Sequence, residues 1–401
     1  MNYQDRIKLS NKVHPFFQGI SSDLLFWPAI NTLFLVTVKG FSAAQISSLT
    51  TIGTLSSIVF YHFIFKIIKK IGDLNSIKLG VILLLCSALL LTFSNTYLLI
   101  LLGAILYNIS SLFKNMDNVL LRKNLTLENR VEDYFYIQNK TSLIYAFVTM
   151  VIAFTTGFLF NVNNYLPMIL CIFFCLVNVI LSNFLYETKT TETKSSYKKQ
   201  KFNISKNQIV FLSLLLFGSL YSVIDLGQSN SKLFIQYELS SFLEIDKVAI
   251  ILTFIIAISR IVRVVTDFLF TSVYKEKKDS VLIKIGYLLV FSFISIIIGS
   301  LIEFNYLGIF LMSIGFFIFL GSRDPFDNYI KTLLLNNCSE QFHELAITYL
   351  TLSRKIGNFL ISCIITLLLL KVDMLYIMIF LLIISIFNIL IIKKIYSLIH
   401  K

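Results

Sequence analysis

Long apolar runs separated by short polar segments recur along the whole chain. Twelve runs are long enough to cross a bilayer as helices, because a hydrocarbon core about 30 Å thick takes roughly 20 residues. Lipid offers the backbone no hydrogen-bond partner, so each run is expected to be helical. The pattern therefore predicts an all-α membrane protein with twelve transmembrane helices. The runs cover residues 16–38, 43–65, 77–95, 97–119, 135–160, 165–186, 208–232, 248–272, 281–302, 305–330, 344–370 and 373–392.

The longest polar stretch divides these runs six and six. It reads ETKTTETKSSYKKQKFNISKN and covers residues 187–207. A stretch of this composition between periodic segments is typical of a linker. The sequence therefore predicts an N-terminal six-helix bundle at residues 1–186, a cytosolic central linker, and a C-terminal six-helix bundle at residues 208–401.

The two halves also share short sequence matches. IKLG at residues 77–80 recurs as IKIG at 283–286, and DN at 117–118 recurs as DN at 327–328. The matches keep their order and nearly equal spacing, which favours a duplication. Two parallel six-helix halves around a site near the bilayer midplane are one architecture of secondary transporters.

Composition agrees with a membrane protein. Of the 401 residues, 56% are apolar and only 14% are charged, with a mean hydropathy of +0.80. Soluble domains carry about 25% charged residues. The net charge of +13 has two possible meanings, a nucleic-acid partner or a membrane topology signal.

The positions of the basic residues distinguish these two meanings. With a cytosolic N-terminus, most Lys and Arg residues fall on the cytosolic side, and the only ones in outer segments are Lys39, Lys232, Lys247 and Lys371. This is the positive-inside pattern. It predicts a multi-pass protein of a bacterial cytoplasmic membrane with both termini cytosolic. A nucleic-acid partner is therefore disfavoured.

Charged side chains inside the spans are the candidate functional residues. A charge at the bilayer centre costs about 2.5–3.5 kcal/mol, so it is expected to face the protein interior or a water-filled cavity. The predicted helices 77–95, 165–186, 281–302 and 373–392 carry no charge beyond their first turn. We therefore predict a cavity lined by the other helices. Its candidate substrate-binding or proton-coupling residues are Asp23, Trp27, Asp225, Arg260, Arg263 and Arg354.

Each of these candidates has a structural interpretation beside the functional one. Asp23 and Asp225 suit proton coupling or cation binding, and Trp27 lies one turn from Asp23 as a possible aromatic wall. Asp23 would otherwise tie two helices together by a hydrogen bond, and Trp27 would serve packing or the membrane interface.

Three charges share one face of the predicted helix 248–272. Arg260, Arg263 and Asp267 follow the i, i+3, i+7 spacing, which places Arg263 and Asp267 within pairing distance. Arg260 is near the middle of the helix and is the better candidate for substrate binding. The structural alternative is an ion pair that holds helices together.

A second group of charges lies toward the predicted cytosolic mouth in both halves. Opposite charges there would close the mouth by pairing as the halves rock. With the first group and Asp267 they come to seven basic and six acidic side chains, which leaves the sign of the substrate's charge open. The candidate gate residues are Lys114, Asp117, Lys140, Arg323, Asp324, Asp327 and Lys355.

Two segments carry a resemblance to the major facilitator superfamily, which extends over essentially the whole chain. The loop between the second and third helices of that family reads G-x-x-x-D-x-x-G-[RK]-[RK]. Here Gly72 matches the second glycine, whereas Lys69 stands at the aspartate position and Asp73 at the first basic position. The segment LFKNMDNVLLRKNL resembles S-G-x-D-x-A-L-L-Y-D-S-L of one poorly characterised bacterial group, with Arg122 and Lys123 in place of Tyr-Asp.

The resemblance implies a monomeric secondary transporter that moves a small solute by alternating access, coupled to protons. Multidrug or toxic-compound efflux is an alternative, although the G-x-x-x-G-P-x-x-G-G signature of drug/proton antiporters is absent. A polytopic receptor or a membrane-embedded enzyme is more remote, because the four histidines are scattered. The sequence contains no phosphate-binding G-x-x-x-x-G-K-[ST] loop and no metal-type cysteine spacing. We therefore expect no cofactor, no metal and no catalytic residue.

Overall fold

The computed structural model describes residues 3–130, 133–187, 208–276, 281–302, 305–338 and 343–399. These residues form helices joined by short turns, as the apolar pattern predicts. The predicted linker, residues 187–207, lies outside the described residues except for Glu187.

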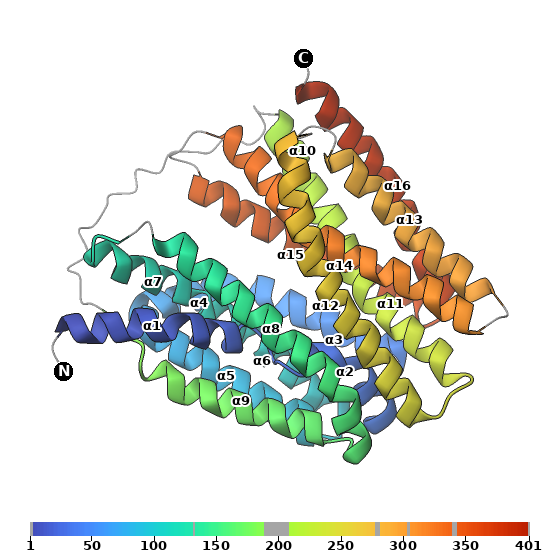
Figure 1. Cartoon of the computed structure of the whole chain (residues 1–401), viewed down its shortest axis with the longest axis horizontal. Helices are drawn as coiled ribbons and strands as arrows, with labels where there is room; N and C mark the ends of the chain where they lie inside the picture. Colours follow the sequence, from blue (N-terminus) through green and yellow to red (C-terminus); the bar gives the residue numbers. More distant parts are fainter. Residues whose placement is uncertain are drawn as a thin grey trace. The chain divides into compact units, whose positions relative to one another are not determined.

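Eighteen helical elements follow one another along the described residues (Figure 1). The elements of the first part of the chain are α1 (Tyr3–Ser21), α2 (Trp27–Leu33), the π-helical turn η1 (Phe34–Val38), α3 (Ala43–Val59), α4 (Tyr61–Ile71), α5 (Asp73–Phe93), α6 (Tyr97–Lys114), α7 (Met116–Leu127), α8 (Asp133–Val162) and α9 (Leu166–Ser182). Those of the second part are α10 (Gln208–Leu216), the π-helical turn η3 (Phe217–Tyr221), α11 (Ser222–Ser240), α12 (Ile245–Glu276), α13 (Val281–Leu301), α14 (Asn305–Asn336), α15 (His343–Leu368) and α16 (Met374–Ile399).

The chain folds as two compact units. The first comprises Met1–Phe34 and Ile52–Tyr197, and the second comprises Leu35–Thr51 and Lys198–Lys401. The segment Leu35–Thr51 belongs to the second unit, where the Ser47 and Thr51 hydroxyls lie 2.8 and 3.1 Å from the hydroxyl of Thr366 on α15.

Length and apolar composition mark most of these helices as membrane-spanning. Nine helices among the described residues could each cross a membrane, or ten when α3 and α4, which meet at 56°, count as one span. Two further apolar helical segments, Trp27–Val38 and Leu166–Ser182, are shorter. Over its described residues the chain is therefore a helical, multi-pass membrane protein.

The predicted single helix 16–38 is wrong. The structure has a helix that ends at Ser21, a break, and a second helix that begins at Trp27. Pro28 explains the break, because its ring lacks an N–H donor and would clash with the carbonyl of Leu24, four residues earlier, in a continuous helix. Asp23 consequently lies in the break rather than inside the predicted helix 16–38.

Two other predicted ends are also wrong. The helix predicted to end at residue 232 continues through α11 to Ser240, and the one predicted to end at 119 continues, after a kink at Asn115, through α7 to Leu127. Lys232 therefore lies within a helix rather than in the turn that follows it. It lies inside α11 and is 6% exposed. The polar residues that follow it contain no glycine or proline to stop a helix.

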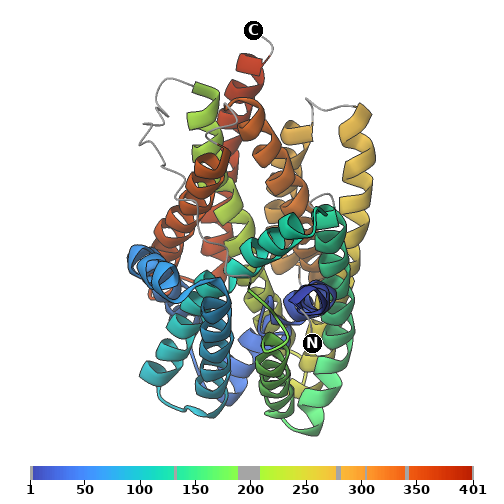
Figure 2. The same cartoon turned by 90° about the vertical axis from the view of Figure 1, so that its left-hand side faces the viewer.

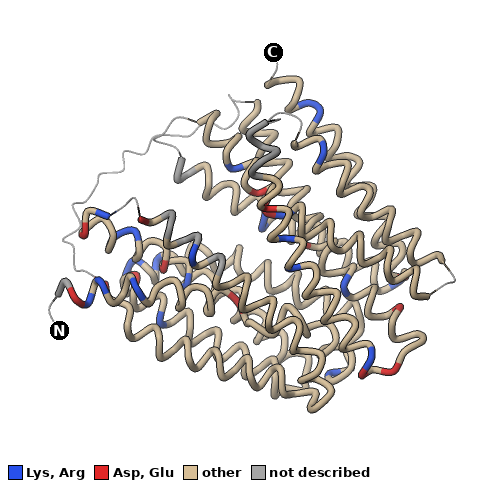
Figure 3. Tube along the Cα trace, in the orientation of Figure 1, with Lys and Arg blue, Asp and Glu red and all other residues tan. Residues whose placement is uncertain are grey.

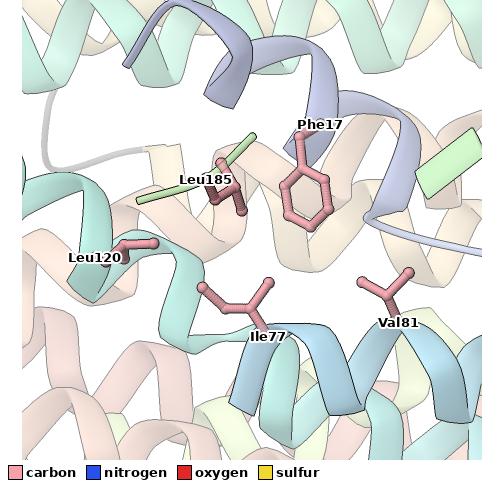
Figure 4. Close-up of a cluster of buried hydrophobic side chains, with 5 residues drawn as sticks. All are labelled: Phe17, Ile77, Val81, Leu120 and Leu185. Atoms are coloured by element: carbon pink, nitrogen blue, oxygen red, sulfur yellow. The ribbon is translucent and has the colours of Figure 1, made fainter. Parts of the chain in front are cut away.

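In the first unit, α1 packs between α8 and α9, and Figure 2 shows it nearly end-on between them. An apolar cluster lies beneath it, with Phe17 of α1 above Ile77 and Val81 of α5, Leu120 of α7, and Leu185 beyond α9 (Figure 4). All five side chains are at most 3% exposed. Burying them fixes the path of α1, and therefore the position of the break that follows it.

In the second unit, α13 and α14 make an extensive contact through small residues. A Cβ on Gly308 would lie 2.5 Å from the carbonyl oxygen of Gly299, so only glycines allow this approach. Small residues at helix crossings are typical of membrane proteins, where packing rather than the hydrophobic effect holds helices together.

Charge is unevenly distributed along the helices (Figure 3). The tubes of α9 and of most of α5, α13 and α16 are uncharged, whereas α7, α12 and α14 carry several charged residues. Charged side chains are therefore concentrated on some helices of each unit and nearly absent from others.

Candidate functional site

The break between α1 and α2 carries the acidic group of the first unit. The Asp23 carboxylate accepts hydrogen bonds from the Leu24 backbone N–H, at 2.8 Å, and from the Tyr107 hydroxyl of α6. Lys114, at the end of α6, donates to the carbonyl of Ser21 at the end of α1. Backbone groups released by the break are thus satisfied by α6, as broken membrane helices require.

Lys114 and Asp117 are buried on either side of the kink at Asn115. They are 7% and 6% exposed, and the Asp117 carboxylate accepts the backbone N–H of Asn118 at 2.6 Å. Gly80 makes room for Lys114, because a Cβ there would lie 2.8 Å from its Cγ. The glycine of the IKLG segment therefore allows the close approach of α5 and α6.

The other candidates of the first unit stand apart from this group. Lys140 is exposed, and its ammonium lies 5.5 Å from the centroid of the Phe16 ring. Trp27 begins α2 and is half-buried. The structure thus places Asp23 beside Tyr107 and Lys114 beside the break. Lys140 contacts only an aromatic ring among the described residues.

The loop between α4 and α5 forms a charged cluster. Gly72 adopts φ +86°, which favours glycine, and ends α4. Asp73 pairs with Lys123 of α7 at 2.5 Å, and the Glu187 carboxylate accepts the backbone N–H groups of Asp73 and Leu74 at 3.1 and 3.0 Å. A carboxylate at a helix N-terminus is stabilised by its free N–H groups and dipole.

The Asp73–Lys123 pair has the reverse polarity of the resembled motifs. Those motifs place a base at position 73 and an acid at position 123, whereas this chain has an acid and a base there. The two substitutions compensate each other. Lys69 plays no part in this pair, because its ammonium lies 4.9 Å from the centroid of the Phe65 ring.

We expect a double-mutant cycle of Asp73→Asn and Lys123→Gln to give a coupling energy of about 0.5–1 kcal/mol in the free energy of unfolding, because the pair is short but half-exposed on the lysine side. The same cycle on Glu244 and Lys247, which lie 3.7 Å apart and are both exposed, should give a value near zero. Equal coupling in the two cycles would contradict the assignment.

Asp225 of α11 is the centre of a larger network in the second unit. One of its oxygens accepts two hydrogen bonds from Arg354 of α15, at 3.1 and 2.6 Å, and one from the Asn358 amide at 3.3 Å. Nε of Arg323, on α14, lies 3.6 Å from the other oxygen. One carboxylate therefore joins α11, α14 and α15, and two guanidinium groups share its charge.

The ring of Tyr221 forms one wall of this network. The guanidinium carbons of Arg354 and Arg323 lie 4.2 and 5.8 Å from its centroid, and Arg323 donates to its hydroxyl at 3.0 Å. Tyr221 ends the π-helical turn η3, which alters the side-chain register just before Asp225. The aromatic face contributes cation–π attraction to both arginines.

A very close crossing of η3 and α15 positions Arg354. A Cβ on Gly357 would lie 1.8 Å from the carbonyl oxygen of Gly218. The hydroxyl of Ser222 donates to the carbonyl of Arg354 at 3.3 Å, and that of Ser353 donates to the carbonyl of Leu214 at 2.5 Å. The network therefore depends on two glycines that the charge pattern alone does not indicate.

The predicted pairing of Arg263 with Asp267 is wrong. Arg263 of α12 instead holds Asp324 of α14 through two hydrogen bonds, of which the Nη2–Oδ1 contact is 3.0 Å. Asp267 lies near that pair, within electrostatic reach of both Asp324 and Arg263. The facing helix presents its carboxylate to the planar guanidinium in a bidentate geometry, which a neighbour on the same helix does less readily.

The remaining gate candidates of the second unit do not form one cluster. Asp327 pairs with Lys331, one turn later on α14, at 2.5 Å. Lys355 lies next to Arg354 and shares its positive field. Arg323, which the sequence placed with the gate, belongs instead to the Asp225 network.

Sequence reasoning missed four partners of these charges. Tyr107, Tyr221 and Asn358 are polar groups in apolar surroundings, a signal present in the sequence but too frequent to be selective. Lys232 was assigned to an outer segment, yet it lies within electrostatic reach of Arg260 of α12. The absence of a helix-breaking residue after position 232 was the signal that would have found it.

No protein-family model matches the chain, and no curated protein matches its sequence. Solved structures, in contrast, match its fold over nearly the full length. The nucleoside transporter NupG superposes with a TM-score of 0.73 at 10% identity, covering 100% of both chains. The POT family transporter PepTSo gives 0.71 at 11%, covering 99% of both chains. An inward-facing bacterial homologue of the iron transporter ferroportin gives 0.70 at 12%, covering 99% of this chain and 100% of the other.

These proteins are transporters of the major facilitator superfamily type, and this chain shares their fold. The fold implied by the sequence resemblance is thereby confirmed. At 10–12% identity the similarity concerns the fold, and the residues of the site must be judged by their own geometry.

Proposed function

We propose that this chain is a secondary active transporter that carries a small solute across the cytoplasmic membrane by alternating access, coupled to protons. The observation that carries the proposal is the Asp225 network. Three helices of an apolar unit converge on one carboxylate that is 16% exposed in its side chain. Charges at this depth are costly to a membrane protein and are typical of substrate and ion pathways.

The helix count supports the topology that this function requires. Nine spanning helices, the bent pair α3–α4 and the two shorter apolar segments add up to twelve spans. We propose that they form two six-helix bundles, residues 1–186 and 208–401, joined by a cytosolic linker, with both termini cytosolic. The protein would act as a monomer in a bacterial cytoplasmic membrane.

Proton coupling is assigned to Asp23. It lies where the helix is broken, and its carboxylate accepts a hydrogen bond from the Tyr107 hydroxyl. A carboxylate in the non-helical segment of a broken membrane helix is typical of the ion sites of secondary transporters. To the Asp225 carboxylate, which is held by two arginines, we assign the role of keeping α11, α14 and α15 in register along that pathway.

The test uses purified protein in liposomes that contain a pH-sensitive dye. Small solutes of different charge, including nucleosides and organic anions, are added outside, and the internal pH is followed. We expect at least one solute to move protons with it, and Asp23→Asn to abolish the pH change while solute exchange continues. Catalytic turnover of a solute in detergent without any flux in liposomes would refute the transporter.

The control variant is Glu244→Gln. Glu244 is 82% exposed in its side chain, so this change removes a carboxylate without touching either network. Proton movement in this variant should equal that of the parent. If Asp23→Asn also moves protons at the parent rate, Asp23 is not the coupling residue.

A further inference from the structure

The helix α4 is amphipathic, and only one of its faces is covered by protein. Ile64 and Ile68 are buried, and they join an apolar cluster with residues at the end of α6. The i, i+3, i+4, i+7 spacing places the polar residues of α4 on the opposite face, where all of them are exposed. These residues are His62, Lys66, Lys69 and Lys70. The face that points away from the protein is therefore basic.

The positive charge of this face is not balanced locally. Residues 59–71 contain three lysines and no acidic residue. Among the described residues, none of the three lysines forms an ion pair with an acidic side chain. The next acid along the chain, Asp73, already pairs with Lys123. Three cations on one exposed face favour an anionic partner.

The bend between α3 and α4 places this face at the edge of the membrane. The 17 residues of α3 form a helix about 26 Å long, which nearly spans a hydrocarbon core of about 30 Å. The axis of α4 then departs from that of α3 by 56°. When α3 crosses the bilayer along its normal, α4 lies closer to the membrane plane than to the normal. The helix therefore runs along the interface, at the level of the lipid headgroups.

Exposed aromatic side chains lie on both flanks of the basic face. Tyr61 and Phe65, one turn apart, stack with their ring centroids 6.5 Å apart and 7° between the planes, and the Lys69 ammonium lies 4.9 Å from the Phe65 centroid. Phe63, on the other flank, is 60% exposed. Aromatic rings beside lysines are typical of amphipathic helices in the membrane interface. A helix surrounded by water would gain nothing from exposing three rings, so this composition favours a lipid partner.

We infer that α4 is an interfacial helix whose lysines, Lys66, Lys69 and Lys70, bind the phosphate groups of anionic phospholipids in the cytosolic leaflet. The aromatic side chains enter the acyl boundary beside these headgroups. Lysines near a membrane surface are attracted by anionic lipid, which gives the site its preference over zwitterionic lipid. In placing α4 at the cytosolic leaflet, the inference rests on the topology of the proposed function. The partner is a component of the membrane and is distinct from the transported solute.

Quenching of a single tryptophan by brominated lipid measures which lipid lies beside α4. Trp27 is the only tryptophan of the chain, so Phe65→Trp in a Trp27→Phe background places the reporter on α4. The purified full chain is reconstituted with brominated phosphatidylglycerol or brominated phosphatidylcholine in the same unbrominated mixture of the two lipids. We expect the anionic lipid to be preferred at least about fivefold, the effect of a single lysine at an anionic surface. Salt at about 1 M should remove most of this preference, because it shortens the Debye length to about 3 Å.

A second reporter and three sets of substitutions assign the preference to these lysines. Phe158 of α8 is 61% exposed and has no basic residue within one turn, so Phe158→Trp should show a ratio near one. Replacing the three lysines of α4 by glutamine should bring the ratio at position 65 to about one, and replacing them by arginine should keep it. The matched control removes the same charge from three other exposed lysines and should leave the ratio unchanged. These are Lys8, Lys12 and Lys371.

Three outcomes would overturn the inference. One is equal quenching by the two lipids at position 65. Another is a preference that the glutamine substitutions on α4 and those at the three control lysines alter equally, since the effect would then belong to the net charge. The last is weak quenching by both lipids at position 65 with normal quenching at position 158, as protein covering α4 would produce.

The quenching ratio separates this inference from the proposed function. Each ratio compares two lipids in one variant, so a change in stability does not imitate loss of binding, and no step depends on transport. Solute-coupled proton movement that persists without an anionic preference would leave the transporter standing and remove only the lipid site. An anionic preference in a protein that moves no solute would do the reverse.

Discussion

Asp225→Asn should lower the free energy of unfolding by about 3 kcal/mol and abolish solute-dependent proton movement. The substitution keeps the shape of the side chain but leaves Arg354 and Arg323 with no compensating charge in the network. Removing one partner of a buried ion pair costs about 3–5 kcal/mol, and the lower figure applies because the Arg354 side chain is 34% exposed. Unfolding of the purified protein in mixed detergent micelles measures the first effect, and the liposome assay measures the second.

Two variants separate charge from shape at this position. Asp225→Glu retains the charge and should lose less stability than Asp225→Asn. Glu244→Gln removes an exposed carboxylate and should change stability by less than about 0.5 kcal/mol. If Asp225→Asn unfolds at the same denaturant concentration as Glu244→Gln, the network does not hold the three helices together.

Gly357→Ala should be more disruptive than its size suggests. The new Cβ would lie 1.8 Å from the carbonyl oxygen and 2.6 Å from the carbonyl carbon of Gly218, both backbone atoms that side-chain rotation does not move. Overpacking costs about 1–3 kcal/mol where side chains give way, so we expect at least about 3 kcal/mol here. Displacing α15 would also withdraw Arg354 from Asp225. The measurement is unfolding in mixed micelles, with proton movement in liposomes as the second readout.

Gly103→Ala is the matched control for this prediction. Both glycines lie within helices, so alanine brings each the same intrinsic gain of about 1 kcal/mol in helix propensity. At Gly103 the nearest atoms belong to the side chains of Leu90 and Leu91, 3.2 Å away, so a shift of a few tenths of an ångström would accommodate the methyl group. A Gly357→Ala protein as stable as Gly103→Ala would show that the crossing of η3 and α15 is looser than described.

The two predictions differ in how far the sequence anticipates them. Asp225 stands out in the sequence as an acid in an apolar run. Its partner Arg354 lies 129 residues away, and no local pattern joins the two. Gly357 has no sequence signal of its own, because a glycine in a membrane helix is common and only a facing backbone makes it indispensable.

Errors at the sequence level have a common physical cause. Hydropathy measures how much apolar surface a segment offers, so it located the apolar runs but not the break at Asp23 or the continuation of α11 past Lys232. Backbone geometry near Pro28 decided the first, and the second followed because no glycine or proline after Lys232 stops the helix. Pairing of Arg263 with Asp324 rather than Asp267 likewise depended on which helix faces α12.

The sequence by itself determined that this chain is a multi-pass helical membrane protein, and which of its side chains are too costly in lipid to be there without a role. Both follow from the free energy of transferring backbone and side-chain groups from water into lipid. That free energy depends on the residue type and not on the tertiary structure. Only the tertiary structure decided that Asp225 binds Arg354 and Arg323, and that Lys232 is buried. Those choices depend on the rotation and register of packed helices, which arise from steric contacts between segments far apart in the chain.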